Sequence, residues 1–454
     1  MKVLVISAGL SPCRGGGLIA YVEEIISGLS SRGHDVVYLN TNGKSSLPFT
    51  HVRHEEGDYK KYTICNSGLF VDGELGTNEP LRQVYPSHRF ASIVRKLLKV
   101  ERPDIVHIHE LLGFPVALLE TLKRQNQKII FTAHDYYSLC PTIKLFKNDQ
   151  KICSLGNDEL ICKQCCSNSK FSWEVRADSV IEKLAASVGR GTRMWHFIRR
   201  NIRTMSRTIN EHFVSPRDYI VRRYEFMKYL TFADAIVAVS ALQLSKMKAV
   251  LGEQPNLRYM YPSRRTFAEK PINGIPALAI SNKVVFVALN INMPAKGSLL
   301  LEKVFSELEN EYENFEVRVY GPTGENTKTI KYMGEYTGAD LDEIVSSADF
   351  GIVPSLWHET YGYVGPEMLS RGIPLIVSST GAMVEYVEDG KNGFIFDPEK
   401  DGSLRFVVER ILTDKSLRAE LRSRTLRSYG KFKSFRDHLS DVESLYHEIR
   451  DRAA

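Results

Sequence analysis

The chain has 454 residues, which is too long for one typical hydrophobic core and favours two domains. Hydrophobic residues make up 43% and charged residues 25%, values that are ordinary for a soluble globular protein and exclude a low-complexity or fibrous chain. The net charge of +6 is mild, so it is compatible with anionic ligands or an anionic membrane face and gives no reason to expect nucleic acid as a partner.

The first ten residues, MKVLVISAGL, are too short in apolar length and too poor in basic residues for a signal peptide, and we expect a buried strand there. No apolar run reaches the ~18 residues that span a bilayer. Seven cysteines without a secretory signal favour a reducing compartment over a disulfide framework. We therefore expect a cytoplasmic protein, peripheral at most on the inner membrane face.

Short β-branched runs alternate with helical patterns in the first half of the chain, which predicts a parallel sheet covered on both faces. Strands are expected at KVLVIS, DVVYLN, DIVHIHE, KIIFTAHD and ADAIVAVS, with helices over Leu18–Ser31 and Leu112–Lys123. The stretch near 140–230 does not fit this rhythm, because it holds a cysteine cluster and then a basic helical segment. We interpret it as an insertion into the first domain.

The same alternation restarts at KVVFVALN and continues through Ser298–Glu309, FEVRVYG, DLDEIVSSADFGIVPS and IPLIVSS. Prolines and Gly274 between Tyr261 and Pro276 mark the boundary. The sequence thus predicts two Rossmann-like α/β domains, 1–265 and 266–430, with their ligand site in the cleft between them, and a last helix in 431–454.

Three glycines, Gly15, Gly16 and Gly17, follow the first strand and open a helix. Backbone amides at such a place approach a ligand closely and favour negative charge, so Gly16 and Gly17 are candidates for phosphate or substrate contact. A flexible surface turn is the alternative. The dinucleotide fingerprint G-x-G-x-x-G is absent, which makes a nucleotide-dependent dehydrogenase an unlikely class.

The segment from His358 to Glu367 carries the strongest functional pattern. Glu359 lies just past a predicted strand and Glu367 in the first turns of the next helix, with the backbone amides of Tyr361, Gly362, Tyr363 and Val364 between them. A diphosphate resting on those amides would have one carboxylate on each side to accept bonds from hydroxyl groups. A nucleotide sugar has this layout, whereas two ordinary surface glutamates would be the plainer interpretation.

The pattern Glu359-x7-Glu367, followed by Gly372-Ile373-Pro374, Gly381-x3-Glu385 and Gly390-x2-Gly393, resembles the signature of family 4 retaining glycosyltransferases. The glycine-rich loop, the run Asp104–Glu110 and His134-Asp135 agree with it. The resemblance covers nearly the whole chain outside 140–230. It implies the two-Rossmann GT-B fold and a last helix that crosses back onto the first domain.

The resemblance also implies roles for single residues. Glu359 would contact hydroxyls of the donor sugar, Glu367 the ribose and Lys296 the donor diphosphate, while His109 would be the active-site histidine and His134 would lie one strand away. Both histidines could instead be structural residues. Many relatives place an Arg shortly before the Lys, but Leu289 and Asn290 stand there in this chain. One fixed positive charge is therefore missing. Either Lys296 and the backbone amides compensate the diphosphate charge, or another cation enters the site, or the activity is lower.

Four cysteines, Cys140, Cys153, Cys162 and Cys165, supply the number and kind of ligands that a structural Zn²⁺ takes, and similar spacing occurs in some relatives. Reduced cysteines in a loop are the alternative. Residues 190–210 contain six Arg and no acid, with apolar residues on one helical face. This stretch could lie on an anionic membrane surface or pack on the first domain.

The sequence therefore predicts a retaining hexosyl- or N-acetylhexosaminyltransferase without a catalytic metal, which moves a sugar from a nucleotide-sugar donor to a saccharide or lipid-linked saccharide acceptor. Synthesis of cell-surface polysaccharide or glycoconjugate is the expected setting. The alternative is a non-catalytic GT-B scaffold that binds a partner through its cysteine-rich insertion. The missing Arg favours that alternative, whereas the glutamate pair and His109 oppose it.

Overall fold

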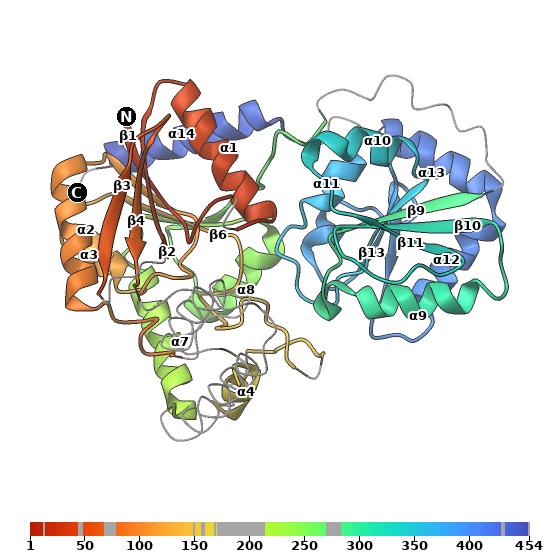
Figure 1. Ribbon diagram of the computed structural model, residues 1–454, viewed down its shortest axis with the longest axis horizontal. Helices are drawn as coiled ribbons and strands as arrows, with labels where there is room; N and C mark the ends of the chain where they lie inside the picture. Colours follow the sequence, from red (N-terminus) through yellow and green to blue (C-terminus); the bar gives the residue numbers. More distant parts are fainter. Residues whose placement is uncertain are drawn as a thin grey trace, which may run out of the picture.

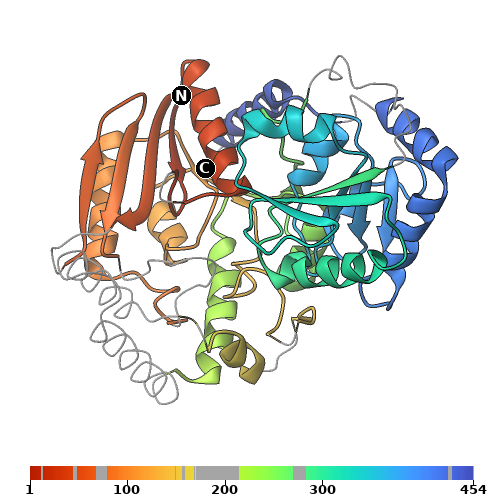
Figure 2. The ribbon, with the colours of Figure 1, turned by 45° about the vertical axis from the view of Figure 1, so that its right-hand side comes forward.

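The computed structural model describes residues 1–11, 14–43, 49–67, 79–148, 150–155, 159–167, 169, 214–268, 283–427 and 432–452. These residues form two lobes that lie side by side, each built on its own twisted sheet (Figures 1 and 2). The predicted basic helical stretch at 190–210 lies outside the described residues.

The first sheet has the strand order β3-β4-β2-β1-β5-β6-β7-β8. Its pairs are parallel except for β3 and β4, which are antiparallel. The strands are β1 (Lys2–Ile6), β2 (Asp35–Gly43), β3 (His51–Glu55), β4 (Lys60–Cys65), β5 (Ile105–Ile108), β6 (Ile129–Ala133), β7 (Ala235–Ala238) and β8 (Leu257–Tyr259).

The helices of the first lobe lie on both faces of this sheet. They are α1 (Gly17–Ser31), α2 (His88–Glu101), α3 (Leu118–Lys123), α7 (Pro216–Leu230) and α8 (Ala241–Leu251), while a further helix, α4 (Glu159–Cys165), packs on α7 away from the sheet (Figure 1). Alternate residues of β1 explain the two layers: Val3 and Val5 pack with α1, whereas Leu4 and Ile6 pack with α2, α3 and α7. Strands buried on both faces read as continuous apolar runs, which is why they were predictable.

The second sheet, with the order β11-β10-β9-β12-β13-β14, is parallel throughout its described pairs. Its strands are β9 (Val284–Leu289), β10 (Phe315–Tyr320), β11 (Ile330–Gly334), β12 (Phe350–Val353), β13 (Leu375–Ser378) and β14 (Gly393–Phe396). Its α-helices are α9 (Ser298–Leu308), α10 (Leu341–Ser346), α11 (Val364–Leu369), α12 (Ser403–Thr413) and α13 (Lys415–Arg427), and its 3-10 turns are η1 (Pro294–Lys296), η2 (Gly338–Asp340) and η3 (Ala382–Glu385).

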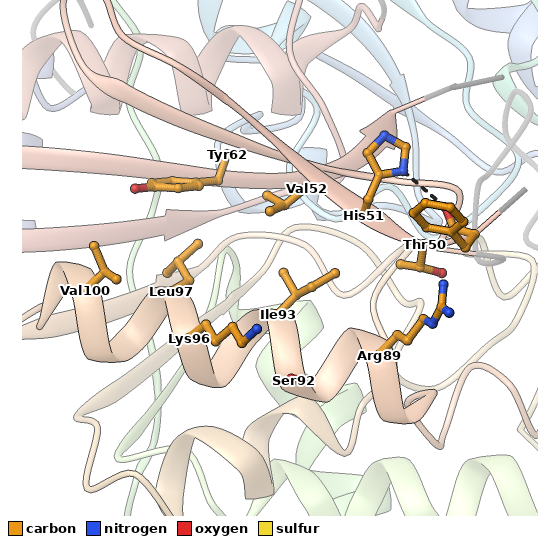
Figure 3. Close-up of a pocket in the computed structure, with 11 residues that line it drawn as sticks. Thr50, His51, Val52, Tyr62, Arg89, Ser92, Ile93, Lys96, Leu97 and Val100 are labelled. Atoms are coloured by element: carbon orange, nitrogen blue, oxygen red, sulfur yellow. Dashed lines mark hydrogen bonds between the residues drawn. The ribbon is translucent and has the colours of Figure 1, made fainter. Parts of the chain in front are cut away.

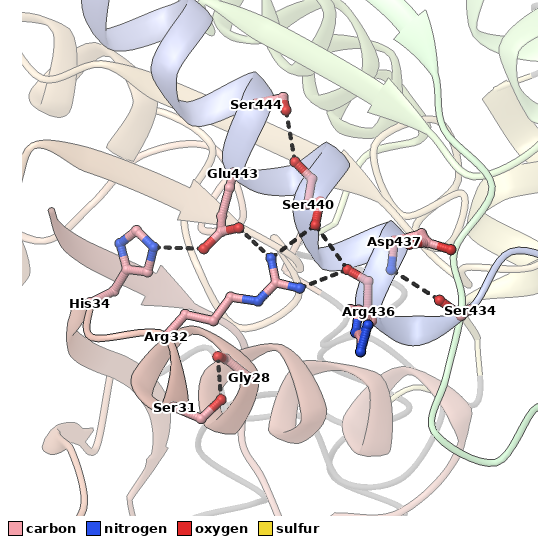
Figure 4. Close-up of polar contacts among 10 residues, drawn as sticks. All are labelled: Gly28, Ser31, Arg32, His34, Ser434, Arg436, Asp437, Ser440, Glu443 and Ser444. Atoms are coloured by element: carbon pink, nitrogen blue, oxygen red, sulfur yellow. Dashed lines mark hydrogen bonds and ion pairs between the residues drawn. The ribbon is translucent and has the colours of Figure 1, made fainter.

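The last helix, α14 (Phe435–Asp451), leaves the second lobe and packs on α1 of the first (Figure 1). Phe435, Leu439 and Tyr446 are buried in the same apolar cluster as the α1 face of the first sheet. Polar contacts border this cluster: the Arg32 guanidinium pairs with Glu443 and donates to the Arg436 carbonyl oxygen, and His34 Nε2 lies 2.9 Å from Glu443 (Figure 4).

Two elements differ from the predicted pattern. The helix expected over Leu112–Lys123 begins only at Leu118, because Pro115 lies in the turns before it and lacks the backbone N–H that a helix interior requires. The antiparallel pair β3–β4 was not predicted. Its outer strand, HVRHE, is largely exposed and has Val52 as its single apolar residue, so it lacks the apolar run of the buried strands.

Candidate active site at the ends of the strands

Lys296 is positioned by a tight turn that follows β9. The 3-10 turn η1 ends at Gly297, whose φ of 81° is left-handed, and a Cβ there would lie 2.1 Å from the carbonyl oxygen of Pro354. The backbone N–H of Leu356 donates to the Ala295 carbonyl oxygen at 2.8 Å. These contacts fasten the Lys296 turn to the loop after β12, which carries Glu359.

Glu359 lies in that loop with its carboxylate largely shielded from solvent. Ser355 Oγ donates to its Oε2 at 3.2 Å, and the Ala382 N–H donates to its carbonyl oxygen at 2.9 Å. Burial raises the pKa of Glu359, and the positive charge of Lys296 is the strongest of the influences that oppose the rise. Lys296 forms no ion pair within the described part of the chain, so its charge is available to an anionic ligand beside this carboxylate.

Glu367 is buried, and its carboxylate is already occupied by two groups from the segment that joins the lobes. Arg264 Nη1 donates to Oε1 at 3.1 Å and Thr266 Oγ1 donates to the same oxygen at 2.6 Å. Burial raises the pKa of Glu367, and the Arg264 charge opposes this. Because Arg264 also pairs with Glu24 on α1 at 3.0 Å, one guanidinium connects Glu367 to the first lobe.

The turn from Tyr361 to Val364 faces the glycine-rich loop of the first lobe. Gly362 has a φ of 77°, and Tyr386 Oη donates to the carbonyl oxygens of Tyr361 and Gly362. The Tyr363 ring lies so close to Gly17 that a Cβ there would be 2.6 Å from it. The absence of a side chain at Gly17 thus admits a tyrosine of the opposite lobe, a contact that the sequence did not reveal, while Gly16 lies beside it with a φ of 109° and open space where a Cβ would stand.

His109 and His134 follow the neighbouring strands β5 and β6, as predicted, and their rings face each other. His109 Nδ1 and His134 Nε2 lie 3.2 Å apart in a shared hydrogen bond. Burial lowers the pKa of His109 to about 3 and that of His134 well below its usual value, so both rings are neutral near pH 7. Their other nitrogens, His109 Nε2 and His134 Nδ1, are buried without a partner among the described residues.

The loop of Glu359 touches this histidine pair directly. Thr360 Oγ1 donates to the carbonyl oxygen of His134 at 2.8 Å across the two lobes. The Glu359 loop, whose carboxylate interacts with the charge of Lys296, is therefore bonded to the backbone of the histidine pair of the first lobe. Unpaired buried nitrogens are costly unless a ligand or water satisfies them, so this place is suited to a ligand rich in hydroxyl groups.

Three residues at this site were missed by sequence reasoning. Tyr21 of α1 packs its ring against His134 at 4.9 Å between centroids, and its hydroxyl shares a 2.8 Å hydrogen bond with His438 Nε2 of α14. Arg264 is the third. No sequence signal identified them. Tyr21 occupies an ordinary apolar position of a helix, and His438 and Arg264 lie in segments that are distant in sequence and reach the site only in the folded chain.

The predicted cysteine ligands lie in the described residues as free thiols. Burial raises the pKa of Cys162 and Cys165, and mutual repulsion of charge with Cys140 and Cys153 adds to it, so the four are near one another. In the portion of the chain that the structure describes, no group of three or more His, Cys, Asp or Glu is arranged to hold a metal ion. The zinc site stays a prediction.

A groove of about 650 Å³ lies at the far edge of the first sheet, between α2 and the β3–β4 pair (Figure 3). Its floor is apolar, with Val52, Ile93 and Leu97, and Arg89 and Lys96 add positive charge along the helix (Figure 3). None of the residues predicted for donor binding lines it. This groove is therefore separate from the site between the lobes.

The fold defines the class of architecture: two α/β lobes on mainly parallel sheets, with polar residues at the facing strand ends, which is the GT-B fold. Solved structures agree with the fold. Sucrose-phosphate synthase of Thermosynechococcus elongatus matches with a TM-score of 0.63 at 14% identity, covering 99% of this chain and 98% of that one. HepE of Anabaena, solved with UDP-glucose, matches with a TM-score of 0.61 at 14% identity over 99% and 100%.

Sequence families give the narrower assignment. Residues 15–154 match Glycosyltransferase Family 4 and residues 277–427 match Glycosyl transferases group 1. An uncharacterised glycosyltransferase of Methanocaldococcus jannaschii is 32% identical over 89 residues, 20% of this chain and 23% of that protein, so the chain matches less than a quarter of that relative. The protein belongs to glycosyltransferase family 4, as its sequence motifs predicted. Membership also removes the dehydrogenase interpretation.

No helix in the described ranges combines the length and apolar character needed to cross a bilayer.

Proposed function

We propose that the protein transfers a hexosyl or N-acetylhexosaminyl group, with retention of configuration, from a nucleotide sugar to a saccharide or lipid-linked saccharide acceptor. One observation carries the proposal: two neighbouring buried histidines each have a nitrogen without a described partner, and the loop that carries Glu359, near the charge of Lys296, bonds to the backbone of one of them. A sugar satisfies hydroxyl-binding groups of this kind, and an attached diphosphate satisfies the lysine. Synthesis of cell-surface polysaccharide or glycoconjugate is the setting that we propose.

In this proposal each residue acts on a different part of the donor. The neutral His109 ring holds a sugar hydroxyl and supports the positive charge that develops at the sugar carbon, while His134 fixes the orientation of His109 through their shared hydrogen bond. Glu359 accepts from sugar hydroxyls. Lys296 and backbone amides of the 361–364 turn compensate charge on the leaving diphosphate, so the reaction proceeds without a catalytic metal. Glu367 accepts from the ribose through its second oxygen, Oε2, because Arg264 and Thr266 both bond to Oε1.

The UDP-glucose bound in the Anabaena structure supports a uridine nucleotide as the first donor to test. Assays of sugar transfer and donor hydrolysis across UDP-, GDP- and ADP-sugars would identify the donor, and NMR of the product would give its anomeric configuration. We expect Glu359→Gln to lower kcat/KM by about 10- to 100-fold, the value of one or two hydrogen bonds to a charged group. Glu399→Gln, an exposed change in the same lobe, is the matched control.

If Glu359→Gln and Glu399→Gln reacted at equal rates, Glu359 would have no role in donor binding. A product of inverted configuration would disprove the retaining mechanism. A protein that processes no nucleotide sugar would instead support the non-catalytic scaffold.

Two further features remain proposals. We propose a structural Zn²⁺ on Cys140, Cys153, Cys162 and Cys165, which are close enough for their charges to interact. Metal analysis of the purified protein tests this proposal, and less than a trace of zinc rejects it.

We also propose a cytoplasmic protein that attaches peripherally to the anionic inner membrane face, on the basis of the basic stretch 190–210.

A further inference from the structure

The diphosphate end of the site lacks one positive charge on the side of the second lobe. Leu289 is buried in the core, and Asn290 has a φ of 55° and donates from Nδ2 to Tyr336 Oη at 2.8 Å. Neither residue supplies a cation at the position where relatives carry an Arg. Arg264 does not replace it, because that guanidinium is engaged by Glu24 and Glu367 at the ribose end.

Lys144 reaches this end from the first lobe. Its Nζ donates to Met293 Sδ at 2.9 Å, and Met293 is the residue that precedes the η1 turn carrying Lys296. Ala295 and Trp357 of the second lobe are buried in the main apolar cluster of the first lobe, and Met293 packs against it. The Lys144 ammonium therefore lies where the two lobes meet, at the same turn as Lys296.

The backbone on either side of Lys144 is held in an unfavourable conformation. Ile143 has a φ of 75° and Leu145 a φ of 51°, and a left-handed conformation is a true outlier for a β-branched residue such as isoleucine. Strain of this kind persists where surrounding contacts enforce it, often at functional sites. Here the Tyr136 N–H donates to the Ile143 carbonyl oxygen at 3.0 Å and the Cys153 N–H to that of Leu145 at 2.8 Å.

These contacts fix Lys144 between two anchored neighbours. Leu145 is 1% exposed and belongs to the first-lobe core, so the loop cannot shift without losing that packing. The charge of Lys144 also reaches the Glu359 carboxylate, where it adds to Lys296 in opposing the burial that raises the pKa of Glu359.

We propose that Lys144 is the second cation of the donor-diphosphate site and takes the place of the Arg that the second lobe lacks. The inference rests on the proposed function. When the bond between the sugar carbon C1 and the diphosphate oxygen breaks, its electron pair stays on that oxygen. The acceptor oxygen bonds to C1, and its proton passes to the departing diphosphate. Lys144 and Lys296 stabilise the charge that gathers there. Since the two cations come from different lobes, tight diphosphate binding requires the lobes to be together.

The test measures phosphate-dependent affinity. Wild type, Lys144→Ala and the control Lys151→Ala, an exposed lysine of the same loop, are titrated with UDP, GDP and ADP and with the corresponding nucleosides by calorimetry. We expect Lys144→Ala to weaken binding of the preferred nucleoside diphosphate by about tenfold or more, as for a lost charge-assisted hydrogen bond, with nucleoside affinity unchanged. Lys144→Arg should recover part of the loss, and Lys151→Ala should bind like wild type.

A second variant separates charge from packing. Lys144→Met keeps an apolar side chain of similar length beside Met293 without the charge, so it should match Lys144→Ala in diphosphate affinity while its thermal unfolding matches wild type. If Lys144→Ala or Lys144→Met bound the diphosphate as tightly as Lys151→Ala, the role of Lys144 would be refuted and the proposed function would stand. Equal losses for nucleoside and diphosphate would show a purely structural loop residue. If wild type bound none of the three diphosphates, the proposed function and the role of Lys144 would fail together.

Discussion

The two lobes hold their sides of the proposed donor site by different kinds of contact. In the second lobe, Glu359 accepts from Ser355, four residues away in sequence, and both belong to one continuous loop. In the first lobe, Tyr21 bonds to His438, 417 residues away, and His107 bonds to Tyr446, 339 residues away. The Glu359 carboxylate is thus held by a contact within its own loop, whereas the histidine side depends on docking of the C-terminal helix.

Substitutions on the two sides should therefore differ in whether they lower turnover or stability. A local loop positions groups that meet the ligand, so changes there should affect chemistry more than folding. A buried network made by distant segments stabilises the fold itself, so changes there should affect stability more than turnover. Substitutions of Lys296, Tyr446 and Arg32 separate these outcomes.

The largest effect is expected at Lys296. Lys296→Ala removes the cation beside Glu359, and kcat/KM should fall by about 10²- to 10³-fold, the range for losing one preorganised group that stabilises developing negative charge. Unfolding should change little, because Lys296 is in no described ion pair. Lys303→Ala, which removes an exposed charge from α9, is the control.

Steady-state kinetics with the identified donor and urea unfolding of the same samples check this. A loss of stability in Lys296→Ala that is as large as its loss of activity would contradict the view that the second-lobe loop acts mainly on chemistry.

The same difference explains how much the sequence could predict. Two parallel sheets, the last helix and the positions of His109, His134, Lys296 and Glu359 after their strands all follow from local patterns: apolar runs, glycine turns and a motif confined to one loop. The roles of Tyr21 and Arg264 could not be predicted, because each depends on a contact with a residue far away in sequence. Tyr21 bonds to His438 and Arg264 bonds to Glu367. Lys144 likewise looks like any loop lysine until the lobes meet.

The second prediction concerns the first-lobe network. Tyr446 Oη shares a 2.7 Å hydrogen bond with His107 Nδ1, and Tyr446 is fully buried. Tyr446→Phe leaves that nitrogen without its partner, so the free energy of unfolding should fall by roughly 1–3 kcal/mol. Turnover should fall far less than in Lys296→Ala, because His107 lies behind the His109 ring, which it contacts.

Urea unfolding of Tyr446→Phe beside Tyr224→Phe, an exposed tyrosine that should lose no stability, makes the comparison. If Tyr446→Phe lost activity as severely as Lys296→Ala while keeping its stability, the histidine network would belong to catalysis, and the contrast between the lobes would be wrong.

The smallest effect is expected where the C-terminal helix meets α1 at the surface. Arg32 pairs with Glu443 and donates to Ser440 Oγ at 3.0 Å (Figure 4), but its side chain is 26% exposed, so water screens the pair. Arg32→Ala should lower the free energy of unfolding by only about 0.2–1 kcal/mol, with the loss shrinking as salt is added. Apolar burial of Phe435, Leu439 and Tyr446 would then be the main force that holds α14 in place. A loss well above that of Tyr446→Phe, persisting at high salt, would instead show that charged surface contacts dock this helix and, through it, shape the first-lobe side of the site.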